Sequence, residues 1–278
     1  MKQLLVIELY KLARQPRTWL TFGLMTILLS LINLGMAIDG RKMFDMILQP
    51  MSEQFIISGN LVNGQLISYM ALNMLWVHIP IILVIVTGDI VSGEFESGTI
   101  RLMLCSTLKR WQWLVAKIIS AYLFVIVFMV FSGVLMVLPA HFIFGSGDLI
   151  VLNEGIQIIE EKFVFSRFVQ AMLFGTLGMF TFATVSVFFS VTLRSSLAAI
   201  LASLGVLIVS TLIQTFGMGI FESWQPLLFT WHMAQWQRIF VANPDINSIL
   251  QSVAVLVLHI AVLTAVALYR FNHLKITE

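Results

Sequence analysis

Charged residues are scarce in this sequence of 278 residues. They make up 11% of the chain, whereas soluble domains carry about 25%. So few charges could not cover the core of a soluble fold in which 59% of the residues are hydrophobic. Disorder is excluded by the same figures, because disordered chains are poor in hydrophobic residues and rich in charge. The composition therefore predicts an integral membrane protein.

Cysteine is almost absent, and the motifs of several catalytic classes are missing. The single Cys105 excludes an intrachain disulfide, and we identify no catalytic partner for it. His, Asp, Glu and Cys show no metal-ligand spacing, so we expect neither a catalytic site nor a metal site. None of the seven lysines follows a glycine, so the phosphate-binding motif G-x-x-x-x-G-K-[ST] is absent. The chain is therefore expected to hydrolyse no ATP by itself and to hold no cofactor.

Six apolar stretches bounded by charges are long enough to cross about 30 Å of hydrocarbon, which takes about 20 helical residues. They predict spans at about 18–38, 66–88, 114–138, 168–193, 196–217 and 248–269. These stretches are too long for barrel strands and lack an alternating polar pattern. The predicted fold class is an all-α polytopic membrane protein with six transmembrane helices, forming a single domain over residues 1–278.

The distribution of basic residues predicts the orientation. With both termini on the cytoplasmic side, eleven of the sixteen Lys and Arg residues lie inside and five lie outside. The inside set is Lys2, Lys11, Arg14, Arg17, Arg101, Lys109, Arg110, Lys117, Arg194, Arg270 and Lys275, and the outside set is Arg41, Lys42, Lys162, Arg167 and Arg238. Cytoplasmic loops carry the excess of basic residues. We therefore expect an N-in, C-in multi-pass protein of the cell membrane, specifically the bacterial cytoplasmic membrane.

Residues 1–17 are predicted to form an interfacial helix. They do not resemble a secretory signal, because the apolar run that follows has about 20 residues and no small-residue cleavage site. Three leucines are expected to face lipid and three basic side chains to face phosphate, namely Leu5, Leu9 and Leu12, and Lys2, Lys11 and Arg14.

A seventh apolar stretch, residues 223–237, is too short to span the membrane. It holds Trp224, Trp231 and Trp236, with Pro226 between the first two. Tryptophan favours the membrane–water interface. The stretch is therefore either an interfacial loop or a re-entrant helical hairpin. Residues 140–167, between the third and fourth spans, are expected to form a solvated external loop.

Polar side chains within the spans are few, and no Asp, Glu, Lys or Arg is expected deep in any of them. Proton- and sodium-driven carriers usually need such a group, so this absence argues against a secondary transporter. Asn73, His78 and His259 are candidates for a substrate path. For each histidine the alternative is a packed side chain bonded to neighbouring backbone. Pro80 lacks an amide hydrogen, which predicts a kink in the second span close to His78.

The connection between the second and third spans, residues 88–113, is predicted to be cytoplasmic and is too long for a tight turn. Gly98 interrupts a helical tendency on either side. From Thr99 onward we expect a short amphipathic helix, whose apolar face holds Ile100, Met103, Leu104 and Thr107. Glu94 and Glu96 are expected to pair with a partner protein or with basic groups of this chain. Lys117 is expected to extend its ammonium to the lipid headgroups.

This connection resembles that of the type-2 ABC exporter permeases, the membrane subunits of the ABC-2 family. Members tend to carry a Glu, a Gly-Thr about four residues later, a basic residue, and then an Arg and a Lys leading into the third helix. The matching residues are Glu94, Gly98, Thr99, Arg101, Arg110 and Lys117. The start of the chain, Glu8-Leu9-Tyr10-Lys11 with Arg14 and Arg17, is also similar to that of these permeases. One departure is Thr107-Leu108, where many members have a proline.

The resemblance implies a non-catalytic permease subunit of an ATP-driven exporter for an amphipathic or hydrophobic peptide, drug or lipid. Residues 92–110 would couple it to a separate ABC ATP-binding subunit, which binds ATP and Mg. The implied coupling residues are Glu94, Glu96, Gly98, Thr99, Arg101 and Arg110. A second permease subunit, identical or different, and the lipid bilayer are further expected partners, and no nucleic acid is expected. The alternative is an ATPase-independent membrane channel or sensor, although no predicted span shows a regular polar stripe.

Overall fold

The computed structural model describes residues 1–52, 62–100, 109–153, 155–216, 222–241 and 243–274. The elements in order are α1 (Lys2–Arg14), α2 (Pro16–Ser52), α3 (Gly64–Leu75), α4 (His78–Thr87), α5 (Ser92–Glu96), α7 (Arg110–Phe144), β1 (Leu149–Asn153), β2 (Gly155–Ile159), α8 (Glu161–Leu193), α9 (Ser196–Phe216), η1 (Glu222–Leu227), α10 (Phe229–Met233), η2 (Ala234–Phe240) and α11 (Ile246–Asn272). Six helical stretches in these ranges are long and apolar enough to cross a membrane. The predicted fold class, an all-α polytopic membrane protein, is confirmed.

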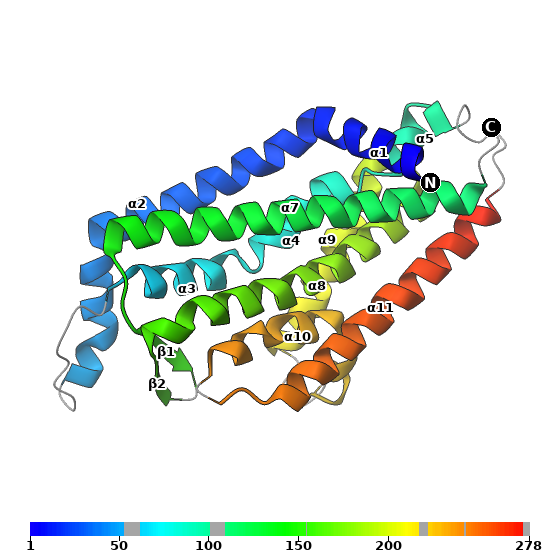
Figure 1. Ribbon diagram of the computed structural model, residues 1–278. Helices are drawn as coiled ribbons and strands as arrows, with labels where there is room; N and C mark the ends of the chain where they lie inside the picture. Colours follow the sequence, from blue (N-terminus) through cyan, green and yellow to red (C-terminus); the bar gives the residue numbers. More distant parts are fainter. Residues whose placement is uncertain (53–61, 101–108, 154, 217–221, 242, 275–278) are drawn as a thin grey trace.

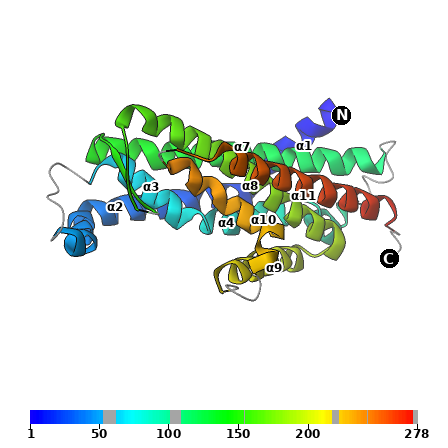
Figure 2. The ribbon, with the colours of Figure 1, turned by 90° about the horizontal axis from the view of Figure 1, so that it is seen from below.

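The long helices lie side by side in one bundle (Figure 1). Both chain termini, α1, α5 and the end of α11 lie at one end of it, and the β1–β2 hairpin lies at the other. Figure 2 shows α9 at one side of the bundle and α7 toward the opposite side. Termini at the same end agree with an even number of crossings.

Helix α8 is buried most completely among the helices that run the full length of the bundle. In its most apolar stretch of 18 residues, 61% of the residues are buried. Its inner positions include small and hydroxyl residues, which let neighbouring helices approach closely: Gly175, Gly178, Thr181, Ala183, Thr184, Ser186 and Ser190. The hydroxyls of Thr181, Thr184 and Ser186 donate to carbonyls four residues earlier in the same helix. Their protons are therefore used within α8 and do not create a polar surface.

The corner between α1 and α2 is set by local chemistry. Gln15 is extended, as expected for a residue before proline, and Pro16 begins α2, where its missing amide hydrogen costs nothing. Side chains of the first turn of α2 then satisfy carbonyls at the end of α1. The Thr18 hydroxyl donates to Leu12 O at 2.6 Å, and Trp19 Nε1 donates to Ala13 O at 3.0 Å.

The second predicted span is broken. α3 ends at Leu75 and α4 begins at His78, so Trp76 and Val77 lie between two separate helices. Pro80 has no amide hydrogen to donate to the carbonyl of Trp76, which removes one helical hydrogen bond at this point. The kink predicted from Pro80 falls at this two-residue break, where Trp76 and Val77 keep helical backbone angles and the Trp76 amide still bonds to Leu72 O at 3.0 Å.

Two connections between the spans have more structure than the sequence predicted. Residues 149–159 form an antiparallel hairpin, and three of its side chains are buried, namely Leu149, Val151 and Ile159. The expectation of a wholly solvated loop is therefore wrong. Residues 222–240 are helical and pack against α8, α9 and α11. The stretch 223–237 consists of short helical segments, and Trp236 within it is completely buried; whether it is interfacial or re-entrant stays a prediction.

A close approach at Gly64 joins the start of α3 to the end of α7. Gly64 N donates to Gly145 O at 2.9 Å, and a Cβ on Gly64 would lie 2.6 Å from Ala140 O. We expect Gly64→Ala to lower the stability by about 1–3 kcal/mol, since backbone atoms would have to move apart. The measurement is the thermal unfolding midpoint in detergent. Gly205→Ala is the control, because a Cβ there meets nothing within 4 Å. Equal midpoints for the two variants would contradict this interpretation.

Candidate functional site

Three carboxylates in and just before α5 each bond to a different part of the bundle. Asp89 pairs with Arg17 at the start of α2 and accepts a hydrogen bond from the Ser196 hydroxyl. Glu96 accepts from the backbone N–H of Ser196 at 2.8 Å. That N–H belongs to the first residue of α9, whose unpaired amides favour a negative charge. Glu94, the third carboxylate, belongs to a cluster of four charges.

This four-charge cluster consists of Glu8 and Lys11 from α1, Glu94 from α5 and Lys117 from α7. Lys117 Nζ contacts Glu94 Oε1 and lies 2.6 Å from Glu8 Oε2. Lys11 Nζ lies 3.1 Å from Glu94 Oε1 and 3.2 Å from Glu8 Oε1. The side chains of Glu8 and Lys117 are 2% and 4% exposed. Two acids and two bases thus join three elements that are distant in the sequence.

Burial makes the four-charge cluster costly to disrupt. Removing one partner of a buried ion pair typically costs about 3–5 kcal/mol, because the other charge stays buried without compensation. Burial by itself would lower the pKa of Lys11, but the carboxylates of Glu94 and Glu8 raise it above its ordinary value of 10.5. Because the folded-state pKa is raised, the stabilisation from Lys11 is present at neutral pH. It is lost only as the pH rises through the raised pKa of the folded state.

The turn between α4 and α5 is fixed to α8 by a serine. Ser190 Oγ accepts from the backbone amides of Val91, at 3.2 Å, and Ser92, at 2.8 Å. It donates in turn to Ser92 Oγ at 3.0 Å. The chain that enters residues 92–110 is therefore bonded to α1, α2, α7, α8 and α9 at once.

Gly98 ends this anchored segment in a left-handed backbone conformation, with φ +69°. The predicted interruption at Gly98 is confirmed. Glycine is required here by the backbone conformation and not by lack of space, because a Cβ would meet nothing within 4 Å. The next residue, Thr99, is exposed, and its hydroxyl lies 2.9 Å from that of Ser97. The predicted residues Arg101, Met103, Leu104, Cys105 and Thr107 lie outside the described part of the chain.

Arg110 begins α7 and binds the end of the last helix. Its Nη1 donates to Asn272 O at 3.2 Å and to Leu274 O at 2.9 Å. These carbonyls lack helical partners at the end of α11, where a cation is favourable. Arg110 therefore ties the two helices together at the end of the bundle that carries the termini.

Two expectations about this end are wrong. Lys117 does not extend toward lipid headgroups, because α1 and α5 cover it with acidic partners. Leu12 does not face lipid either, since α1 buries a stripe made of Leu4, Glu8 and Leu12 against the protein. The available signal was the four-residue spacing of this stripe, which places one carboxylate between two leucines, because a buried acid requires a partner. The anchoring roles of Asp89, Ser190 and Ser196 were not predicted from the sequence.

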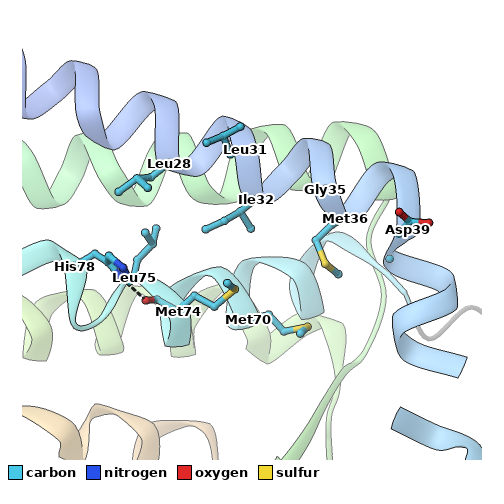
Figure 3. Close-up of a pocket in the computed structure, with 11 residues that line it drawn as sticks. Leu28, Leu31, Ile32, Gly35, Met36, Asp39, Met70, Met74, Leu75 and His78 are labelled. Carbon is cyan, nitrogen blue, oxygen red and sulfur yellow. Dashed lines mark hydrogen bonds between the residues drawn. The ribbon is translucent and has the colours of Figure 1, made fainter. Parts of the chain in front are cut away.

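An apolar groove of about 460 Å³ lies between α2 and α3 (Figure 3). We call it the α2–α3 groove. It is lined by Leu28, Leu31, Ile32, Gly35, Met36, Asp39, Gly40, Met70, Met74, Leu75 and His78. Figure 3 shows Asp39 and His78 at opposite ends, with the apolar side chains between them. His78 Nδ1 is hydrogen-bonded to Met74 O at 2.8 Å. The groove suits an apolar or amphipathic molecule.

The structure does not bring the three predicted substrate-path residues together. His78 lines the α2–α3 groove, whereas Asn73 donates to Tyr69 O at 2.9 Å and accepts from Gln237 at 2.9 Å. His259 is hydrogen-bonded to Val255 O at 2.8 Å. Both histidines are thus bonded to a carbonyl four residues earlier, but His78 is exposed in the α2–α3 groove whereas His259 is half-buried. Among the described residues, no three His, Cys, Asp or Glu side chains are placed to hold a metal ion.

The four-charge cluster predicts a charge-exchange effect. Lys117→Glu alone should place three acids around Lys11 and strongly lower the amount of folded protein. Glu8→Lys combined with Lys117→Glu restores two acids and two bases at these positions, so we expect partial recovery. Fluorescence-detected size exclusion after a heat step measures the folded fraction. Lys42→Glu is the control, because its pair with Asp39 is exposed and should matter little. A double variant no better than Lys117→Glu would refute the pairing.

A family match includes nearly the whole chain but only part of the four-charge cluster. No curated protein matches the sequence. One family model, described as "Protein of unknown function (DUF2705)", matches residues 19–276. That match includes Glu94, Lys117 and the α2–α3 groove, while Glu8 and Lys11 precede it. The chain belongs to the DUF2705 family.

Proposed function

We propose that the chain is the transmembrane permease subunit of an ATP-driven exporter, coupled through residues 92–110 to a separate ATP-binding subunit. In this proposal the chain is not an enzyme, and ATP and Mg are bound by the partner. A functional unit contains a second permease subunit, identical or different. The membrane is the bacterial cytoplasmic membrane, with the end that carries both termini facing the cytoplasm.

The observation that carries the proposal is the anchoring of α5. A coupling segment must transmit a push from outside the membrane to the helices within it. Glu94 bonds to α1 and α7, and Glu96 bonds to the first residue of α9. Because these contacts are buried or hydrogen-bonded, a displacement of the segment after Gly98 would move several helices instead of a free loop. An ordinary solvated loop would not need such bonds.

The α2–α3 groove supports a hydrophobic or amphipathic substrate. Its walls are apolar apart from Asp39 and His78, and three methionines line it: Met36, Met70 and Met74. Methionine side chains are flexible and polarisable, so they adapt to ligands of different shape. Of the three predicted substrate-path residues, only His78 has this support.

The alternative, an ATPase-independent channel or sensor, has less support in the described residues. A channel needs a path lined by polar groups. The buried hydroxyls of Thr181, Thr184 and Ser186 in α8 donate to carbonyls of their own helix, and the α2–α3 groove is mainly apolar. Co-purification of the tagged chain from its native membrane decides between the two. Recovery of an ATP-binding protein whose ATPase activity depends on this chain supports the exporter, and ATP-independent flux through the chain alone supports the channel.

The coupling role predicts a specific response at Gly98. Gly98→Val forces a β-branched residue into positive φ, which costs about 1–3 kcal/mol and should misdirect the segment that follows. Combined with Glu94→Lys, it should abolish substrate-stimulated ATPase activity and transport by the assembled complex. Gly98→Asn is the matched control, because asparagine tolerates this conformation. Normal coupled transport by the Gly98→Val, Glu94→Lys variant, at normal membrane abundance, would exclude the assignment.

The α2–α3 groove predicts a blocking substitution. Gly35 lines the groove, and a Cβ there meets nothing within 4 Å, so Gly35→Phe should fit and fill the space. We expect ATP-dependent uptake of a hydrophobic fluorescent dye into inverted vesicles to fall several-fold, with the complex still assembled. Gly23→Phe is the control on the same helix, since its position is also open but lies outside the groove. Equal uptake by both variants would remove the groove from the substrate path.

A further inference from the structure

A second cavity, of about 160 Å³, lies where the second span is broken. We call it the break pocket. Trp76, Val77 and Pro80 form one wall, and residues of α9 and of the segment 230–234 form the others. Its lining residues are all different from those of the α2–α3 groove, which uses Leu75 and His78 from the same break. The break pocket is therefore a separate site.

One wall of the break pocket carries a buried polar group without a partner. Thr230 is 6% exposed, and its hydroxyl oxygen has no hydrogen-bond partner among the described residues. Buried hydroxyls in native proteins are almost always hydrogen-bonded, to protein groups, to water or to a ligand. An unpaired one that borders a cavity indicates that the cavity holds something able to bond it.

The other polar groups of the break pocket are mostly acceptors. The hydroxyl groups of Thr211 and Thr215 donate to carbonyls of α9, at 2.8 and 3.0 Å. Their oxygens can therefore only accept further hydrogen bonds. Trp76 is a further lining residue, and Pro80 cannot donate to its carbonyl. Gln214 is the one amide side chain among the described lining residues, and its NH2 group is a donor. A ligand with a hydroxyl suits these walls, because it can donate to the threonine oxygens and also accept from Thr230 or Gln214.

No Asp, Glu, Lys, Arg or His is among the described residues that line the break pocket, so an ion would be buried there without a counter-charge. The rest of the lining is apolar and includes Leu207 and Met233. We propose that the break pocket binds a small uncharged molecule with one hydroxyl or N–H donor on an apolar body. The size fits, since a cavity of about 150 Å³ in another protein accommodates benzene. This inference is independent of the ATPase partner.

Benzyl alcohol and toluene form a matched pair of probes, because they differ by a hydroxymethyl and a methyl group on the same ring. Thermal unfolding of the full chain in dodecyl maltoside is measured across a concentration series of each, compared at equal concentration in the micelle. Benzyl alcohol should raise the midpoint and saturate, whereas toluene should not. At ten times its Kd, a ligand that binds only the folded state lowers the unfolded-to-folded ratio about elevenfold.

Thr230→Val removes the unpaired hydroxyl with little change of shape. We expect it to abolish the difference between benzyl alcohol and toluene, and to leave the midpoint of the ligand-free protein unchanged or higher. Thr181→Val in α8 is the control outside the pocket and should keep the difference. Thr211→Val is a second lining variant and should weaken it. Three results would each overturn the proposal. They are equal shifts of the midpoint with both probes, an undiminished difference in Thr230→Val, and no saturable shift, which is expected of a pocket that holds only water.

Discussion

The buried ammonium of Lys117 is the constraint on which one end of this fold depends. It lies within α7, where 4% of the side chain is exposed, and an unpaired charge in that position would cost several kcal/mol. The first turn of α7 offers no acid, so the partners must come from elsewhere in the chain. Glu8 and Glu94 supply them, which requires α1 to lie along α7 and α5 to lie against both. The position of α1 is therefore set by electrostatics as well as by its leucines.

Much of the fold follows from residues that act locally along the chain. Charges at the ends of apolar runs give the long spans, and the structure places helices at all six. Pro80 gives the break in the second span, because the lost hydrogen bond depends on one residue type. Gly98 likewise marks a turn that its own backbone conformation explains. These features needed no knowledge of which helices are neighbours.

The features that could not be predicted depend on contacts between distant segments. Lys117 at the start of a span fits the pattern of a headgroup-seeking lysine, and only the approach of α1 and α5 makes it a buried ion. Trp236 fits an interfacial tryptophan but is buried within the bundle, where its ring lies tilted against that of Trp76. For the candidate site, the resemblance indicated Glu94, Glu96 and Arg110, while their respective partners Lys11, Ser196 and Asn272 emerged only from the three-dimensional arrangement.

The break in the second span connects the two ends of the molecule. α4 leads directly into the turn that Ser190 and Asp89 hold, so these contacts link the end of α4 to α8 and α2. Between α3 and α4 the helix is broken and Pro80 cannot donate to the Trp76 carbonyl, so α3 need not follow α4 as a rigid extension. Both cavities border this joint, the α2–α3 groove through Leu75 and His78 and the break pocket through Trp76 and Pro80. In the proposed exporter, a movement that begins at the coupling segment would therefore reshape both cavities at the same joint.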